Sequence, residues 1–137
     1  MENNNSKTSH HISVCEANFY RIKRLINNFD SNKIKFKIFE FEGNYTYAEL
    51  TIISKSKHTL IYRLKQESSS KFNSFYMDLK ICFDAYLCEA ISYQGEKDIF
   101  NVKEKINSKD EKYQQNRFLT EWLEYALFSE TTIQESI

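Results

Sequence analysis

Proline is absent from this chain of 137 residues, and glycine occurs only twice, at Gly43 and Gly95. Two glycines exclude both a GxGxxG loop and a P-loop, because the glycines of these loops let the backbone approach phosphate groups. The chain is rich in Asn, Ile, Phe and Tyr, and Lys greatly outnumbers Arg, as an AT-rich coding sequence would produce. The shortage of turn residues is therefore weak evidence against turns.

Cysteine is also scarce, with Cys15, Cys82 and Cys88 giving an odd count and no CxxC pair. A disulfide framework is not expected, and a reducing compartment fits this pattern. Residues 1–9 are polar and lack the apolar segment of a secretory signal. No apolar run approaches the ~20 residues that cross a bilayer. We therefore expect a cytoplasmic protein with no membrane partner.

Charge of one sign is not in excess, because 19 basic side chains balance 19 acidic ones. The chain as a whole is therefore not drawn to nucleic acid or to an anionic membrane, and such binding would need a local patch. Nucleic acid is not the expected partner on this ground.

The hydrophobic pattern predicts an α+β fold in which an antiparallel meander of five to six strands lies between an N-terminal and a C-terminal helix. Residues 12–129 fit a single domain, with residues 1–11 as a disordered tail and residues 130–137 as a frayed C-terminus. The first helix is expected over 13–28, starting in a capping box from Ser13 to Glu16. Short connections favour antiparallel pairing, since parallel strands need long crossovers.

The strands are expected near 34–41, 45–53, 58–66, 74–82 and 86–93, with a sixth short strand around Ile99–Val102. A second capping box, Ser108–Glu111, predicts the start of the last helix. The apolar stripe of that helix is the clearest pattern in the chain, and it consists of Phe118, Leu119, Trp122, Leu123, Ala126 and Leu127.

The histidines and cysteines do not form a recognisable catalytic or metal pattern. His10 and His11 lie in the expected tail and His58 at a strand start. We therefore predict no zinc spacing, no Cys/His nucleophile pair, no metal and no cofactor. Cys15 lies near a helix N-terminus, which stabilises a thiolate, but its place on the apolar stripe favours a buried packing role.

Four segments of the chain resemble the YqiB-type family, a bacterial family of unknown function found in gammaproteobacteria. They are Cys15–Phe19 with Arg24–Leu25, Leu50–Ile52 with His58–Leu60, Asp84–Ala85 with Glu89, and Asp110–Lys112 with Gln114, Asn116, Phe118–Leu119 and Trp122–Leu123. The last segment is the most specific, because it combines polar residues and an aromatic stripe in one register. The resemblance implies an intracellular one-domain protein and no particular activity.

The chain departs from that family at several positions. The family tends to carry histidines where this sequence has Phe83, Asn107 and Tyr113, and its linker is longer where this chain runs from Phe100 to Ile106. These departures weaken the case for a histidine-dependent enzyme.

The polar residues shared with the family define a candidate cluster. Its members are Glu16, Asn18, Asp84, Glu89, Asp110, Glu111, Lys112, Gln114 and Asn116. Gathered at one end of the sheet, they could hold a divalent cation through oxygen ligands or act as general acid and base. The alternative is structural, since Glu16 and Glu111 each take the third position of a capping box and Asp110 suits a helix dipole. We favour capping and helix–helix hydrogen bonding.

An open sheet face offers a function of another class. Aromatic rings flanked by cations hold single-stranded nucleic acid on such faces, and the residues concerned are Lys35, Lys37, Tyr45, Tyr47, Arg63, Lys65, Tyr76 and Lys80. Glu49, Asp78 and the zero net charge favour a solvated face instead, with Lys protecting against edge aggregation.

We therefore expect a non-catalytic binding or accessory protein with a protein partner. A carboxylate-based or metal-dependent enzyme and a binder of single-stranded nucleic acid are the two alternatives, and the question of enzymatic activity stays open.

Overall fold

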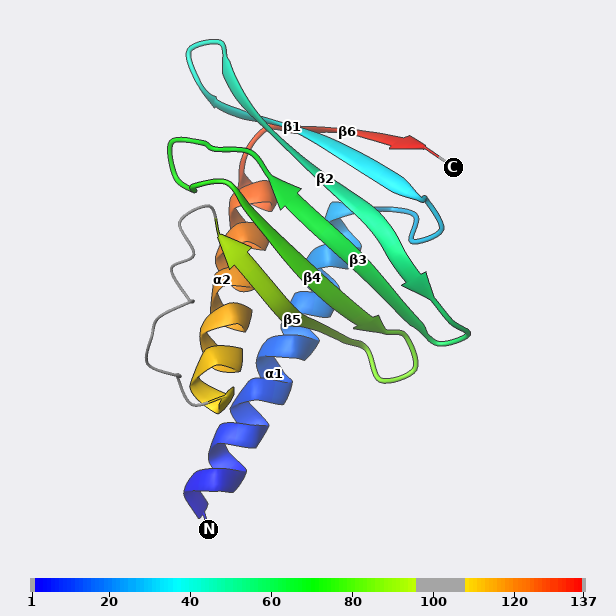
Figure 1. Ribbon diagram of the computed structural model, residues 1–137, viewed down its shortest axis with the longest axis vertical. Coiled ribbons are helices and arrows are strands. Elements are labelled where there is room, and N and C mark those ends of the chain that lie inside the picture. Colours follow the sequence, from blue (N-terminus) through cyan, green and yellow to red (C-terminus); the bar gives the residue numbers. More distant parts are fainter. Residues whose placement is uncertain (1, 96–107, 137) are drawn as a thin grey trace.

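The computed structural model describes residues 2–95 and 108–136 of the chain (Figure 1). Its elements follow in the order α1 (Glu2–Leu25), β1 (Lys33–Phe41), β2 (Asn44–Lys55), β3 (Thr59–Gln66), β4 (Phe75–Cys82), β5 (Leu87–Gly95), α2 (Ser108–Phe128) and β6 (Thr131–Ser136). The predicted α+β class, with an antiparallel sheet and two helices, is confirmed.

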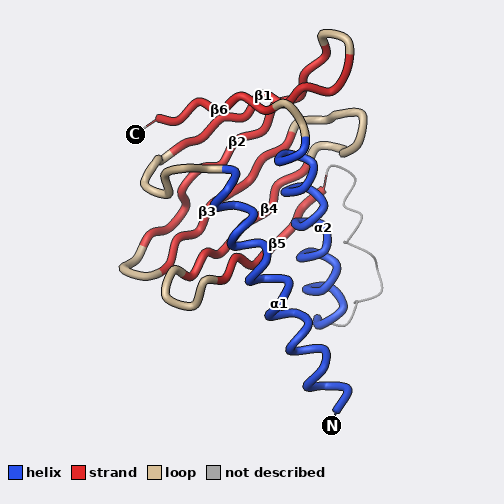
Figure 2. Tube along the Cα trace, turned by 180° about the vertical axis from the view of Figure 1, so that it is seen from behind, coloured by secondary structure: helices blue, strands red, loops and turns tan. Residues whose placement is uncertain are grey.

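The six strands form one sheet in the order β5-β4-β3-β2-β1-β6, and all neighbours are antiparallel. The first five strands make a meander, as their short connections predict. The β1–β2 turn uses Gly43 at φ 79°, in the left-handed region that glycine adopts without steric cost. Both helices cross the same face of the sheet (Figure 2), so the opposite face is not covered by either of them.

The core lies between this sheet and the helices. Strand residues alternate between the two faces, so Phe75, Met77, Leu79 and Ile81 of β4 are buried while Tyr76 is exposed. Trp122 of α2 is completely buried, packs edge-on against Phe36 at 5.8 Å between ring centroids, and donates its indole N–H to Gln66 Oε1 at 2.8 Å. The stripe predicted on α2 therefore faces the core.

Helix α1 begins earlier than its predicted start near residue 13. The helix runs from Glu2 through Ser13 and Glu16, so the predicted capping box at these two residues is wrong. No Pro or Gly interrupts residues 2–12, and the half-buried His11 and Val14 continue the packed side of the helix toward its N-terminus.

The C-terminal segment forms β6 where fraying was expected. Thr131 donates its hydroxyl to the Ala126 carbonyl at 2.8 Å at the end of α2, and the next residues pair with β1 in a register that sets Ile133 opposite Phe36. The sixth strand expected around Ile99–Val102 lies outside the described residues. Helix α2 begins at Ser108, as predicted.

Candidate functional site

The end strand of the sheet, β5, meets the two helices through the side chain of Asn116 on α2. The Ala90 backbone N–H donates to Asn116 Oδ1 at 2.8 Å, and Asn116 Nδ2 donates to the Ala90 carbonyl at 3.3 Å and to the Lys112 carbonyl at 2.9 Å. Asn116 is buried. Its amide thus supplies a donor and an acceptor to the strand, as a neighbouring strand would.

A second buried amide, Asn18 of α1, links the two helices. The Thr120 hydroxyl, which has one proton to donate, lies 3.1 Å from Asn18 Oδ1 and 3.0 Å from the Asn116 carbonyl oxygen, and Arg21 donates to Asn18 Oδ1 at 3.0 Å. Asn18 Nδ2 has no hydrogen-bond partner among the described residues. The hydrogen bond between Thr120 and Asn18 therefore joins α2 to α1.

Three side chains with metal-ligating or nucleophilic atoms meet beside Asn116. His11 Nε2 lies 2.9 Å from Glu89 Oε2 and 3.6 Å from Cys15 Sγ, and Cys15 Sγ lies 3.9 Å from Asn116 Oδ1. Lys112 Nζ of α2 lies 3.6 Å from Glu89 Oε2. Helix α1, helix α2 and β5 each contribute to this cluster, which we call the α1–β5 corner: His11, Cys15, Glu89 and Lys112.

Two buried cysteines, Cys15 and Cys88, are held as thiols. Burial, aided by the negative charge of Glu89, raises the pKa of Cys15 from 9.0 to about 12, against a smaller lowering by Lys112. Burial also raises the pKa of Cys88. A protonated thiol is a weak nucleophile, so the structure does not activate Cys15 in the way that a helix N-terminus would.

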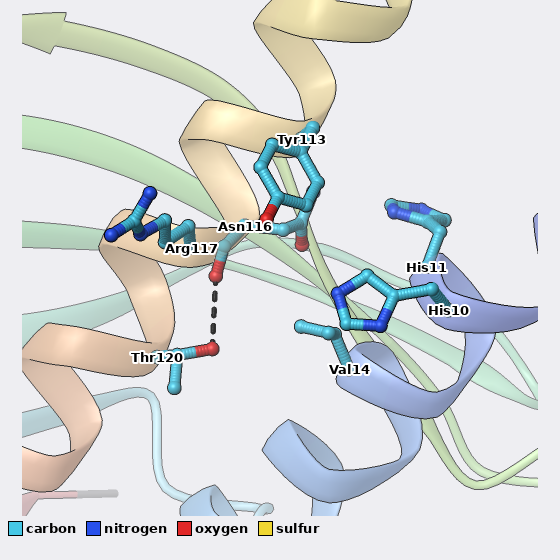
Figure 3. Close-up of a pocket in the computed structure, with 7 residues that line it drawn as sticks. All are labelled: His10, His11, Val14, Tyr113, Asn116, Arg117 and Thr120. Carbon is cyan, nitrogen blue, oxygen red and sulfur yellow. Dashed lines mark hydrogen bonds between the residues drawn. The ribbon is translucent and has the colours of Figure 1, made fainter. Parts of the chain in front are cut away.

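A groove runs between α1 and α2 next to the corner (Figure 3). Its lining residues are His10, His11 and Val14 from α1, with Tyr113, Asn116, Arg117 and Thr120 from α2. A second hollow is also lined by His11, together with Ile12, Cys15, Lys80, Cys82, Leu87 and Glu89. The corner is therefore reached from two shallow depressions.

The residues of the predicted polar cluster are distributed unevenly. Asn18, Glu89, Lys112 and Asn116 belong to the network just described. The other members lie at the surface, with Glu16, Asp84, Asp110 and Gln114 exposed and Glu111 half-buried. Asp110 and Glu111 occupy the first turn of α2, where the helix dipole favours acidic side chains.

Sequence reasoning missed the pairing of His11 with Cys15. The two residues are four apart, so they share one face when both are helical. Placing His11 in a disordered tail hid this relationship, although the absence of Pro and Gly from residues 2–12 was a signal that the helix could extend.

The uncovered sheet face carries the cations and tyrosines named from the sequence. Tyr45, Tyr47 and Tyr76 are 44%, 47% and 46% exposed. Lys37 Nζ lies 4.3 Å from the centroid of the Tyr45 ring, and Lys65 Nζ lies 5.9 Å from that of Tyr76. A shallow hollow on this part of the molecule is lined by Lys35, Phe36, Tyr47, Ala48, Glu49, Lys65 and Glu67.

The two helices of the described ranges both lack an apolar stretch that could cross a bilayer.

Comparison with known proteins gives a family match without a known activity. The model of the family DUF1249, described as a protein of unknown function, matches residues 21–132. The uncharacterized protein YqiB of Escherichia coli strain K12 is 29% identical over 125 residues, which cover 83% of this chain and 84% of that protein. YqiB of E. coli O157:H7 gives the same values. No solved structure matches this chain. The YqiB-type resemblance predicted from the sequence is confirmed.

Proposed function

The chain belongs to the DUF1249 family of proteins of unknown function, and we propose that it is a non-catalytic binding protein that holds single-stranded nucleic acid on the uncovered face of its sheet. The observation that carries the proposal is the set of half-exposed tyrosines with lysines beside them on this face. Bases stack on such rings, and lysines attract the phosphates between them.

The strand register places these groups in rows across the sheet. Lys35 of β1 faces Glu49 of β2, which faces Lys65 of β3, which faces Tyr76 of β4. Tyr47 pairs with Lys37 in the adjacent row. Since neighbouring strands are ~4.8 Å apart and two residues along a strand span ~6.6 Å, Tyr47 and Tyr76, two strands and one row apart, are separated by about 12 Å. The rings therefore offer stacking positions for more than one base.

The charge on this face differs from that of the whole chain. The basic side chains on this face include Lys35, Lys37, Arg63, Lys65 and Lys80, and its acidic ones are Glu49, Asp78 and Glu89, which pairs with Lys80. Each acid lies opposite basic residues: Asp78 accepts two hydrogen bonds from Arg63, at 2.9 and 3.2 Å, and Glu49 lies between Lys35 and Lys65. Because the whole chain is neutral, an excess of positive charge on this face leaves a net negative charge on the rest of the molecule. A polyanion would therefore be oriented toward this face.

A non-catalytic role is supported by the distribution of the predicted polar cluster. Its exposed carboxylates, on Glu16, Asp84 and Asp110, come from three different elements, and none of them lines the hollows described above. A general acid or base must lie within hydrogen-bond reach of the substrate proton that it transfers, and these three carboxylates are not gathered around one such hollow. The network of Asn18 and Asn116 instead joins the helices to β5.

The proposal is tested by fluorescence anisotropy with labelled single-stranded DNA and RNA of mixed sequence at low salt. We expect saturable binding at micromolar protein that weakens as salt rises, because released counterions contribute to the affinity. The double variant Tyr47→Ala/Tyr76→Ala removes two stacking positions, each worth ~1–3 kcal/mol, and should weaken binding at least tenfold.

Tyr20 is the matched control, because it is 53% exposed but lies on α1 at the helical side of the molecule. Tyr20→Ala should leave the affinity unchanged. Equal weakening by both variants, or no saturation at about 100 μM protein, would contradict the proposal. Binding of poly-L-glutamate in place of the oligonucleotides would assign the face to an acidic polypeptide and would equally refute a nucleic acid ligand.

A further inference from the structure

We infer that His11, Cys15 and Glu89 form a binding site for a transition-metal ion, with Zn²⁺ as the expected occupant. One potential ligand atom from each residue, the His11 Nε2, Cys15 Sγ and a Glu89 carboxylate oxygen, lies within 4.8 Å of the other two. The inference concerns the α1–β5 corner and is independent of the function proposed for the sheet face.

Two of the three separations between the ligand atoms are close to those of a tetrahedral zinc site, and the third, between Cys15 Sγ and the Glu89 carboxylate, is within 4.8 Å. Zinc binds nitrogen and carboxylate oxygen at about 2.0 Å and sulfur at about 2.3 Å, so ligand atoms at tetrahedral angles lie roughly 3.3–3.6 Å apart. The His11–Cys15 distance of 3.6 Å already has this value, and the His11–Glu89 distance of 2.9 Å is that of a direct hydrogen bond. Opening the latter by about 0.4 Å, through one carboxylate rotation, would admit the ion.

Rigid elements position the three side chains. His11 and Cys15 are separated by one turn of α1 and therefore project from the same side of the helix. Glu89 lies on β5 beside Ala90, whose backbone groups are held by Asn116. Cys15 is buried, while the side chains of His11 and Glu89 are 28% and 25% exposed. An ion entering from solvent would thus meet the imidazole and the carboxylate first.

The same three residue types also occur in catalytic cysteine triads, but the geometry here is different. In a triad the histidine uses one ring nitrogen for the nucleophile and the other for the carboxylate. Here both Cys15 and Glu89 are nearest to the same atom, Nε2. Convergence on a single nitrogen brings the three ligand atoms around a common point, which suits a metal ion. A set of thiolate and imidazole ligands also selects zinc over magnesium or calcium.

Other groups near the corner affect the affinity. Lys112 Nζ, 3.6 Å from Glu89 Oε2, competes with a cation for the carboxylate, and its side chain is 59% exposed and so free to move away. Lys80 and Cys82 line the second hollow together with His11, Cys15 and Glu89. Binding releases one proton from the Cys15 thiol and leaves Nε2 unprotonated, so the affinity should rise with pH. A fourth position remains for water.

Cobalt(II) titration of the reduced protein tests the site, because thiolate-bound Co²⁺ absorbs in the near ultraviolet. We expect one equivalent to bind with this absorption and Zn²⁺ to displace it. Cys15→Ser should abolish the thiolate band. His11→Gln should weaken binding at least tenfold, whereas His10→Gln, which changes the neighbouring histidine, should not. Lys112→Gln should tighten binding a few-fold by removing the competing cation.

Two results would overturn the inference. The first is the absence of saturable binding at about 100 μM Co²⁺. The second is equal weakening by His10→Gln and His11→Gln. Circular dichroism of each variant checks the fold; because Cys15 is buried, the two histidine variants decide the question if Cys15→Ser unfolds.

Discussion

The two faces of the sheet use similar polar residues in opposite ways. On the helical side, the buried polar groups bond to one another or to the backbone: Asn116 to Ala90, and Gln66 to the Trp122 indole. On the uncovered side, lysines and tyrosines lie next to each other with their rings half exposed. The two faces therefore differ in burial more than in residue type, because polar side chains are enclosed on the helical side and half exposed on the other.

The largest contrast is expected between aromatic residues on the two faces. Trp122→Ala leaves a cavity in the core and a buried Gln66 without its donor, so we expect a loss of about 3–5 kcal/mol in the free energy of unfolding. Tyr47→Ala, on the uncovered face, should cost less than about 1 kcal/mol. Urea melts of the two variants measure both values. Similar losses would mean that the uncovered face is packed in solution.

A smaller effect is expected at the edge of the sheet. Asn116→Ala removes the acceptor of the Ala90 N–H, and an unsatisfied buried group costs about 1–3 kcal/mol. Hydrogen exchange at the Ala90 amide should accelerate in this variant. Gln114→Ala, two residues away on the exposed side of α2, serves as the control and should change neither quantity. Unchanged exchange at Ala90 would show that another group satisfies the strand.

The smallest of the three effects concerns alkaline pH. Burial raises the pKa values of Cys15 and Tyr62 to about 12. Both groups therefore bind their protons more tightly when folded, and their contribution is complete below the unfolded pKa values and is lost as pH rises from about 9 to about 12. Cys15 and Tyr62 together should make urea melts at pH 7 and pH 10 differ by about 1–2 kcal/mol, and the raised pKa of Cys88 adds to this difference in the same direction. The variant Cys15→Ser should reduce this difference, and a stability that rises with pH would contradict the assignment.

Much of the fold follows from periodicity, and the parts that do not have identifiable causes. The α2 stripe ending in Ala126 and Leu127 and the alternation in β4 are long enough to be read from local pattern. The start of α1 is different, because a polar segment such as residues 2–12 can be helical or disordered with the same composition. The formation of the short strand β6 depends on where α2 ends and on pairing with β1. Both are tertiary features that a local sequence pattern does not contain.

The candidate sites could be predicted only in part. The lysines and tyrosines of the sheet face were named from strand alternation, since a period of two assigns each residue to a face. That both helices lie on the opposite face required the structure. The cluster of His11, Cys15 and Glu89 was not predicted, because it depends on the length of α1 and on the position of β5 at the edge next to both helices.

The hydrogen bonds between Asn116 and Ala90 give the sheet two unlike borders. At β5 a side-chain amide takes up both main-chain groups of Ala90, so an incoming strand would have to displace a helix to pair there. At the opposite border, β6 is the last strand among the described residues, and a strand border left without a partner is a site where proteins aggregate. If destabilised variants associate by pairing strands between molecules, the pairing should therefore start at β6. A change that blocks backbone pairing at β6 should suppress this association.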